Sequence, residues 1–173
     1  MIIWKAILRA FLIFCLLTGF IDCKKSPTEA PIDVEKPTIS LTCSPVTAAP
    51  NEVVSLSVLI KSNTKELRVF GLEMAFDSRM FQFQEVRKGT LTAGWTAVDG
   101  NEVGSGSLRV GGFSGGGAAI PVRSEGALAE IRLKVTGGDY GNGQQTQVCI
   151  KQYTDDLAGF QPASACSTFT LKK

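Results

Sequence analysis

The sequence predicts an all-β domain, a jelly-roll sandwich of about nine strands in two sheets. Three observations lead to this prediction. From residue 38 onward, apolar and polar residues alternate with the period of two that half-buried strands require. Most of the 18 glycines lie between the apolar runs, where turns need them. No stretch of this region shows a convincing helical period. The 173 residues suffice for one such domain and a leader.

Residues 1–23 are predicted to be a signal peptide of the lipoprotein type. Lys5 and Arg9 precede an apolar run that is too short to favour a membrane-spanning helix. Residues 19–23, GFIDC, resemble a bacterial lipobox, in which the cysteine is lipidated, although Asp22 stands where glycine, alanine or serine is usual. We expect lipidation at Cys23, with ordinary cleavage and release, or an uncleaved anchor, as the alternatives.

Residues 24–37 form a proline-rich linker. Three prolines alternate with charged and small residues, and the apolar content is too low to be buried. A lipid anchor followed by such a polar tether would hold the next domain away from a membrane surface. The sequence therefore predicts a location in the bacterial cell envelope or on the cell surface, or secretion if the lipobox is not used.

The domain itself is predicted to span residues 38–173. Alternation indicates strands near residues 38–43, 54–60, 70–76, 80–86, 96–98, 108–113, 128–135, 148–150 and 169–171. The strand at residues 128–135 has an irregularity near Glu130. Asp99-Gly100-Asn101 is predicted to be a hairpin turn. The last strand is expected to pair with the first, which would bring the two ends of the domain close together.

The stretch from Phe70 to Val86 is central to this reading. Its two apolar runs, Phe70 to Phe76 and Met80 to Val86, are separated by the polar pair Asp77-Ser78. Each run predicts a strand with one buried face. The polar break between them allows the chain to cross from one sheet to the other.

This stretch also carries a resemblance. Residues 70–95, FGLEMAFDSRMFQFQEVRKGTLTAGW, resemble the part of cohesin domains in which a Tyr-Asp-Pro motif precedes an apolar strand and a Val-x-x-Gly turn. Phe76-Asp77 takes the place of Tyr-Asp, and Val86 to Gly89 takes the place of the turn. Residues 106–117 and 125–137 are similar to the next two cohesin strands in order and spacing. The resemblance covers about residues 38–173.

The resemblance implies a nine-stranded jelly roll that binds a protein partner, the dockerin, with the sheet that contains strands three, five, six and eight. It also implies that the partner-binding face includes the outward residues of strand three, which are Val69, Gly71, Glu73 and Ala75. These residues depart from the polar side chains of dockerin-binding cohesins. Ser114 and glycines replace the acidic residues that often follow strand six.

Three cysteines, Cys43, Cys149 and Cys166, lie in the predicted domain. A secreted protein with three thiols favours one disulfide and one unpaired cysteine. Cys149 and Cys166 both have the outward parity of their strands, which makes Cys149–Cys166 the first choice. A Cys43–Cys149 pair and three reduced thiols remain alternatives.

The sequence gives little reason to expect chemistry. It contains no histidine and no Cys-x-x-Cys pair, so neither a metal site nor a cofactor is predicted. Asp155-Asp156 and the group Asp99, Asn101 and Glu102 lack the spacing of a calcium loop. The glycines of residues 111–117 have no following lysine, so they are not a phosphate loop. The net charge of +2, without a block of like charges, gives no indication of nucleic-acid binding.

We therefore expect a non-catalytic, envelope-tethered module that binds a dockerin-like or other protein in adhesion or scaffolding. A carbohydrate-binding module that recognises a polysaccharide is the alternative, and a structural lipoprotein without a specific ligand is the third possibility. Sugar binding would need exposed, coplanar aromatic side chains, for which the sequence offers four aromatic residues: Trp95, Tyr140, Tyr153 and Phe160.

Overall fold

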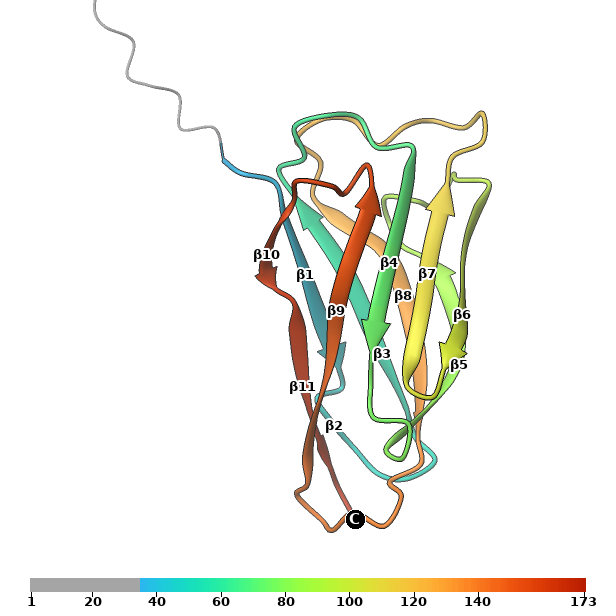
Figure 1. Cartoon of the computed structure of the whole chain (residues 1–173), viewed down its shortest axis with the longest axis vertical. Helices are drawn as coiled ribbons and strands as arrows, with labels where there is room; N and C mark the ends of the chain where they lie inside the picture. Colours follow the sequence, from blue (N-terminus) through green and yellow to red (C-terminus); the bar gives the residue numbers. More distant parts are fainter. Residues whose placement is uncertain (1–34) are drawn as a thin grey trace, which may run out of the picture. The chain divides into compact units, whose positions relative to one another are not determined.

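A computed structural model describes residues 35–173 of the chain (Figure 1). The predicted signal peptide, the lipidation site Cys23 and all of the linker but its last three residues lie outside the described residues. Within residues 35–173 no helix is long and apolar enough to cross a membrane.

The described residues form two β-sheets that pack face to face, as the sequence predicted. The five-stranded sheet has the order β10, β1, β3, β8, β5, and the six-stranded sheet has the order β2, β11, β9, β4, β7, β6. The strands are β1 (Thr38–Ser44), β2 (Thr47–Ala48), β3 (Val53–Lys61), β4 (Val69–Ala75), β5 (Phe81–Lys88), β6 (Ala97–Gly104), β7 (Ser107–Phe113), β8 (Gly126–Val135), β9 (Gln145–Asp155), β10 (Gln161–Ser164) and β11 (Cys166–Leu171).

The stretch from Phe70 to Val86 connects the two sheets. β4 lies inside the six-stranded sheet between β9 and β7, whereas β5 is an edge strand of the five-stranded sheet. Asp77 caps the turn between them, because its carboxylate accepts the N–H and the Nε–H of Arg79 and the hydroxyl of Tyr140. The predicted crossing between sheets at Asp77-Ser78 is confirmed.

The core lies between the sheets, and among the described residues its members fall between Ile39 and Leu171. Phe70, Leu72 and Met74 of β4 are buried, and the Phe81 and Phe169 rings meet edge to face with centroids 5.0 Å apart. Residues 35–173 form one compact unit. Because this unit has its own core, we regard it as a domain that folds without the residues before it.

The C-terminal part differs from the prediction. The last strand, β11, does not pair with β1 but lies in the other sheet, antiparallel to β9 and parallel to the two-residue strand β2. β1 instead pairs with β10, a short strand without the alternating burial that the prediction relied on. β2 and β10 account for eleven strands instead of nine.

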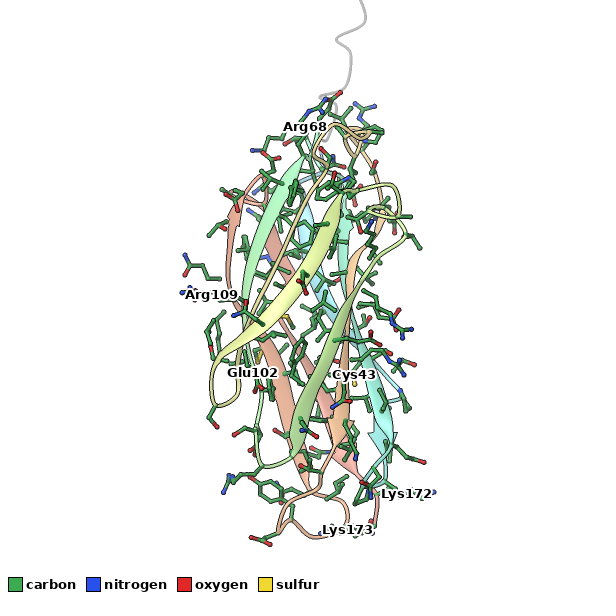
Figure 2. All side chains as sticks on the ribbon, turned by 90° about the vertical axis from the view of Figure 1, so that its right-hand side faces the viewer. Cys43, Arg68, Glu102, Arg109, Lys172 and Lys173 are labelled. Atoms are coloured by element: carbon green, nitrogen blue, oxygen red, sulfur yellow. A yellow bond between two sulfur atoms is a disulfide. The ribbon has the colours of Figure 1, made fainter. Side chains whose placement is uncertain are left out.

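The ends of the described domain also lie apart. At one end of the sandwich, the N–H of Gln161 donates to the carbonyl of Pro37, next to the start of β1. At the other end, the N–H of Lys172 donates to the carbonyl of Ala48. Figures 1 and 2 show Lys172, Lys173 and the C-terminus at the end opposite to the start of β1. The expectation that the two ends meet was wrong, because β10 runs parallel to β1 and β11 continues in that direction to the far end of the sandwich (Figure 1).

Two local expectations were also inexact. Asp99-Gly100-Asn101 is not a turn but the middle of β6, and the hairpin turn lies at Ser105-Gly106, where Gly106 has a φ of 72°. Gly100 is required for packing, because a Cβ there would lie 2.7 Å from a methyl group of Val86. The irregularity in β8 falls at Leu128, two residues before Glu130, where the pairing with β3 shifts.

Candidate functional site

The outer face of the six-stranded sheet presents a regular grid of side chains from β6, β7, β4 and β9. Cross-strand pairing fixes its rows. One row joins Asp99, Gly111, Gly71 and Thr154, and the next joins Asn101, Arg109, Glu73 and Gln152. All four residues that the resemblance assigned to the partner-binding face, Val69, Gly71, Glu73 and Ala75, alternate with the buried residues of β4 and lie on this outer face. Their role in binding stays a prediction.

A shallow depression lies in the middle of this face. Its volume is about 420 Å³, and its lining combines the two rows with Leu72, Gly100 and Val110. Gly71 and Gly111 face each other across β4 and β7, and neither has a side chain to fill the space above the sheet. The depression therefore exists because two glycines meet on neighbouring central strands.

An ion pair forms one side of the depression. Arg109 of β7 donates from its Nε to Glu73 Oε1 at 2.9 Å across the two central strands. Both side chains are well exposed, so the pair adds little to stability. Its effect is to hold two long side chains side by side at the border of the depression. Figure 2 shows Arg109 on the outside of β7.

An exposed apolar pair lies next to the row of glycines. Val69 of β4 and Phe113 of β7 are cross-strand neighbours, and they are 39% and 48% exposed. Ala97 of β6 continues the same row. Apolar side chains that gather on an exposed sheet are typical of surfaces that bind other proteins.

Asp156 fixes the start of β4 beside this apolar pair. Its Oδ2 accepts the backbone N–H groups of Arg68 and Val69 at 2.8 and 3.1 Å, and Lys65 Nζ lies 3.3 Å from Oδ1. Burial alone would raise the pKa of Asp156, but these N–H groups and the Lys65 ammonium outweigh it and hold the pKa below its usual value. Asp156 is thus a structural carboxylate.

The other candidate acids show no metal-binding arrangement. Asp99 Oδ1 accepts the N–H of its neighbour Gly100 at 2.7 Å, and the carboxylate remains exposed. Within residues 35–173, no three cysteine or acidic side chains come together in a group that could hold a metal ion.

The aromatic residues considered for sugar stacking do not form an exposed platform. Trp95 and Phe160 are buried, and the Trp95 ring lies 5.8 Å from that of Phe70 inside the sandwich. Tyr153 pairs with the inward residue Leu72, and its hydroxyl donates to the carbonyl of Phe160 at 2.7 Å. Tyr140 packs under the guanidinium of Arg79 and donates its hydroxyl to Asp77.

The disulfide between Cys149 and Cys166 is confirmed. The two residues face each other across β9 and β11, with Cα atoms 4.0 Å apart. Cys149 also pairs with Ala75, so the disulfide belongs to the outer face of the six-stranded sheet. Among residues 35–173, Cys43 has no disulfide partner; it is 8% exposed, and burial raises the pKa of its thiol to about 11.

The sequence predicted the residues that one strand, β4, contributes to this face, but not those of β6, β7 and β9. Asp99, Asn101, Arg109, Gly111, Gln152 and Thr154 were not assigned to the face. The alternation of Arg109, Gly111 and Phe113 with buried Leu108 and Val110 marks them as outward. Which residues of neighbouring strands share their rows depends on the pairing register, and alternation alone does not give it.

No family model matches the sequence, and no curated protein matches it. Solved cohesin domains do match the structure. The sixth cohesin of scaffoldin B from Acetivibrio cellulolyticus, solved in complex with a mutant Cel5 dockerin, aligns over 78% of this chain and 99% of its own, with a TM-score of 0.61 and 14% identity. The OlpA cohesin of Clostridium thermocellum, solved in a type I cohesin–dockerin complex, aligns over 78% of this chain and 99% of its own, with a TM-score of 0.61 and 16% identity.

A third similar structure is described as a non-cellulosomal cohesin, from the archaeon Archaeoglobus fulgidus. It aligns over 80% of this chain and 92% of its own, with a TM-score of 0.57 and 18% identity. The architecture agrees in each case over nearly the whole of the matched domain, while the sequences have diverged widely. Residues 35–173 therefore have the fold of a cohesin domain.

Proposed function

We propose that residues 35–173 form a non-catalytic module that binds a protein partner with the outer face of the six-stranded sheet. The observation that carries this proposal is the exposed apolar pair Val69 and Phe113 beside the depression. Two of the similar structures are cohesins bound to dockerins, which supports a protein as the ligand. A dockerin-like module is the partner class that fits best.

Carbohydrate binding receives less support from the geometry. Of the four aromatic residues considered, two are buried and the other two are half-buried with their hydroxyls engaged. Stacking on a sugar ring requires an exposed aromatic face. Phe113 is a single exposed ring, and its nearest cross-strand neighbours on the face are the aliphatic residues Val69 and Ala97.

The test is a pull-down from the organism's own envelope extract with residues 35–173 as bait. Val69→Asp places a charge in the apolar pair and should abolish capture of the partner. Val46→Asp is the matched control, because Val46 is also exposed but lies beside β2, at the edge of the sheet farthest from β6 and β7 and outside the rows that line the depression. Recovery of a polysaccharide and no protein, or a partner that binds the Val69→Asp variant as well as the wild type, would refute the proposal.

We further propose that lipidation of Cys23 tethers the module to the cell envelope. The apolar run before Cys23 and the proline-rich linker after it support this proposal. Growth with a labelled fatty acid should label the wild-type protein in the producing organism but not a Cys23→Ser variant. Equal labelling of the two proteins, or none of either, would contradict lipidation at this residue.

A further inference from the structure

The size and charge of the depression on the outer face limit which part of a protein partner can enter it. This inference rests on the proposed function. The depression is small. Three strand spacings of about 4.8 Å separate β6 from β9, and the side chains of Asp99 and Thr154 occupy part of this width. A helix with its side chains, about 10–12 Å across, is too wide to enter, whereas one side chain fits.

Gly111 on the floor of the depression has little structural reason to be glycine. A Cβ at Gly71 would lie 2.5 Å from Thr154 Oγ1, and a Cβ at Gly112 would lie 2.8 Å from the Phe70 ring. Packing against the chain itself thus requires both of these glycines. A Cβ at Gly111 would meet only the carbonyl oxygen of Phe70, at 3.3 Å, and a small adjustment would accommodate it.

Glycine in the interior of a strand weakens the strand, and it often marks a place where a ligand approaches the backbone closely. Gly111 lies in the middle of β7 with a backbone conformation that other residues can adopt. Its lack of a side chain keeps the depression open. We read this as a requirement of the ligand and not of the fold.

The charged side chains around the depression indicate the charge of the group that binds there. Three charged side chains line it, all within the described residues: Glu73, Arg109 and Asp99. Glu73 and Arg109 neutralise each other. Asp99 lies directly opposite Gly111 in the pairing of β6 and β7, and no cation of residues 35–173 forms an ion pair with it. The lining therefore has a net charge of −1, located at one border of the glycine floor.

We propose that one lysine or arginine side chain of the protein partner enters this depression. Its aliphatic part lies over Gly111 and Gly71, and its charged end meets the carboxylate of Asp99. Long cationic side chains commonly combine these two kinds of contact. The amides of Asn101 and Gln152, which line the same space, supply further hydrogen-bonding groups. Gly111 and Asp99 thereby determine which partners bind.

The test uses peptides as the probe. Random 12-residue peptides on phage are selected on immobilised residues 35–173, and peptides that still bind a Gly111→Gln variant are removed. Each remaining peptide should contain a lysine or arginine whose replacement by glutamine weakens binding at least about tenfold. Asp99→Asn should weaken binding by a similar factor. The peptide replacement and Asp99→Asn combined should weaken binding no more than either does alone, because both remove the same ion pair. Glutamate at the peptide position should restore binding to an Asp99→Lys variant.

Two controls keep the result interpretable. Gly141→Gln inserts the same side chain at a loop glycine that also has open space around it, and this variant should bind as the wild type does. Thermal unfolding should show that Gly111→Gln is folded. If Gly111→Gln is unfolded, Gly111→Ala, which adds only the Cβ considered above, replaces it in the removal step.

The outcomes separate this inference from the proposed function. Selected peptides that lack a basic residue, or a charge exchange at Asp99 that fails to restore binding, would overturn the inference while the face remains a protein-binding surface. If no selected peptide depends on Gly111, the inference fails. If the pull-down is also insensitive to Val69→Asp, the proposed function fails with it.

Discussion

Single residues fix the geometry of the candidate face. Asp156 provides the clearest example, because one carboxylate accepts the first two N–H groups of β4 and also approaches Lys65. Asp156 is therefore neither a calcium ligand nor a freely solvated acid, since its carboxylate caps the start of a strand. Gly71 is the second example, because its missing side chain makes room for Thr154.

Replacement of Asp156 should destabilise the domain in a pH-dependent way. Hydrogen bonds to a charged group contribute about 1.5–3 kcal/mol, so Asp156→Asn should lower the free energy of unfolding by an amount of this order at pH 7. Because the folded-state pKa is lowered, this stabilisation is complete above the unfolded pKa of about 3.9 and is lost as the pH falls through the folded-state value. Urea unfolding at pH 7 and pH 2.5 should show the difference between wild type and variant shrinking at the lower pH.

The neighbouring residue Asp155 is the matched control for this experiment. Asp155 has a φ of 58°, which asparagine also tolerates, and its carboxylate accepts one hydrogen bond from the part of the chain that the structure describes, that of the exposed Thr154 hydroxyl. Asp155→Asn should change the stability by less than about 0.5 kcal/mol. Equal effects of the two substitutions would show that Asp156 is not the cap of β4.

At the scale of elements, the alternating strands were predictable and their neighbours were not. β3 and β4 have buried residues at every second position, and so does β8 from Ala129 onward, so their existence follows from the sequence. β10 is exposed throughout, and β2 has only two residues, so neither carries a pattern. Asp99-Gly100-Asn101 has the composition of a turn, but tertiary packing against Val86 decides its structure.

Reactivity of the cysteines should report on the pairing of β9 with β11. The disulfide closes a loop with a sequence separation of 17, which is worth about 3 kcal/mol in the chain-entropy model. A maleimide should label no thiol in the native domain, one in denaturant, and three in denaturant with reductant. Burial and the raised pKa protect Cys43 in the folded state. Labelling of the native domain would contradict this assignment.

The double variant Cys149→Ala/Cys166→Ala should fold but be less stable by about 3 kcal/mol. Guanidinium unfolding of this variant and of the oxidised wild type measures the difference. Cys43→Ala, which removes a buried thiol and leaves the disulfide intact, is the control variant. Maleimide should label no site of this variant in denaturant without reductant, compared with one site in the wild type. A double variant as stable as the wild type would show that the disulfide does not stabilise the pairing of β9 with β11.

For the whole molecule, the sequence was sufficient to predict the two layers of sheet but not to predict the candidate site. Inward residues such as Phe70 and Phe81 determine that two sheets enclose one core. The depression depends on which residues of β6, β7, β4 and β9 share a row. The pairing of β4 with β7 and with β9, whose residues lie more than thirty positions away in the sequence, decides most of this register. Asp99 has the sequence context of a turn and Gly111 looks like an ordinary strand residue, and only the register of the β6–β7 hairpin places one opposite the other.

The position of β11 leads to a prediction for the whole domain. β11 connects β2 to β9 and buries Phe169 and Leu171 in the core, where Phe169 contacts Phe81. Deletion of residues 166–173 removes these side chains and the disulfide and exposes a long edge of β9, so residues 35–165 should not fold cooperatively. Deletion of the exposed residues Lys172 and Lys173 alone should leave a cooperative transition within a few degrees of the wild-type value. Far-UV circular dichroism during heating distinguishes the two results, and a cooperative transition of residues 35–165 would show that the core does not depend on its last strand.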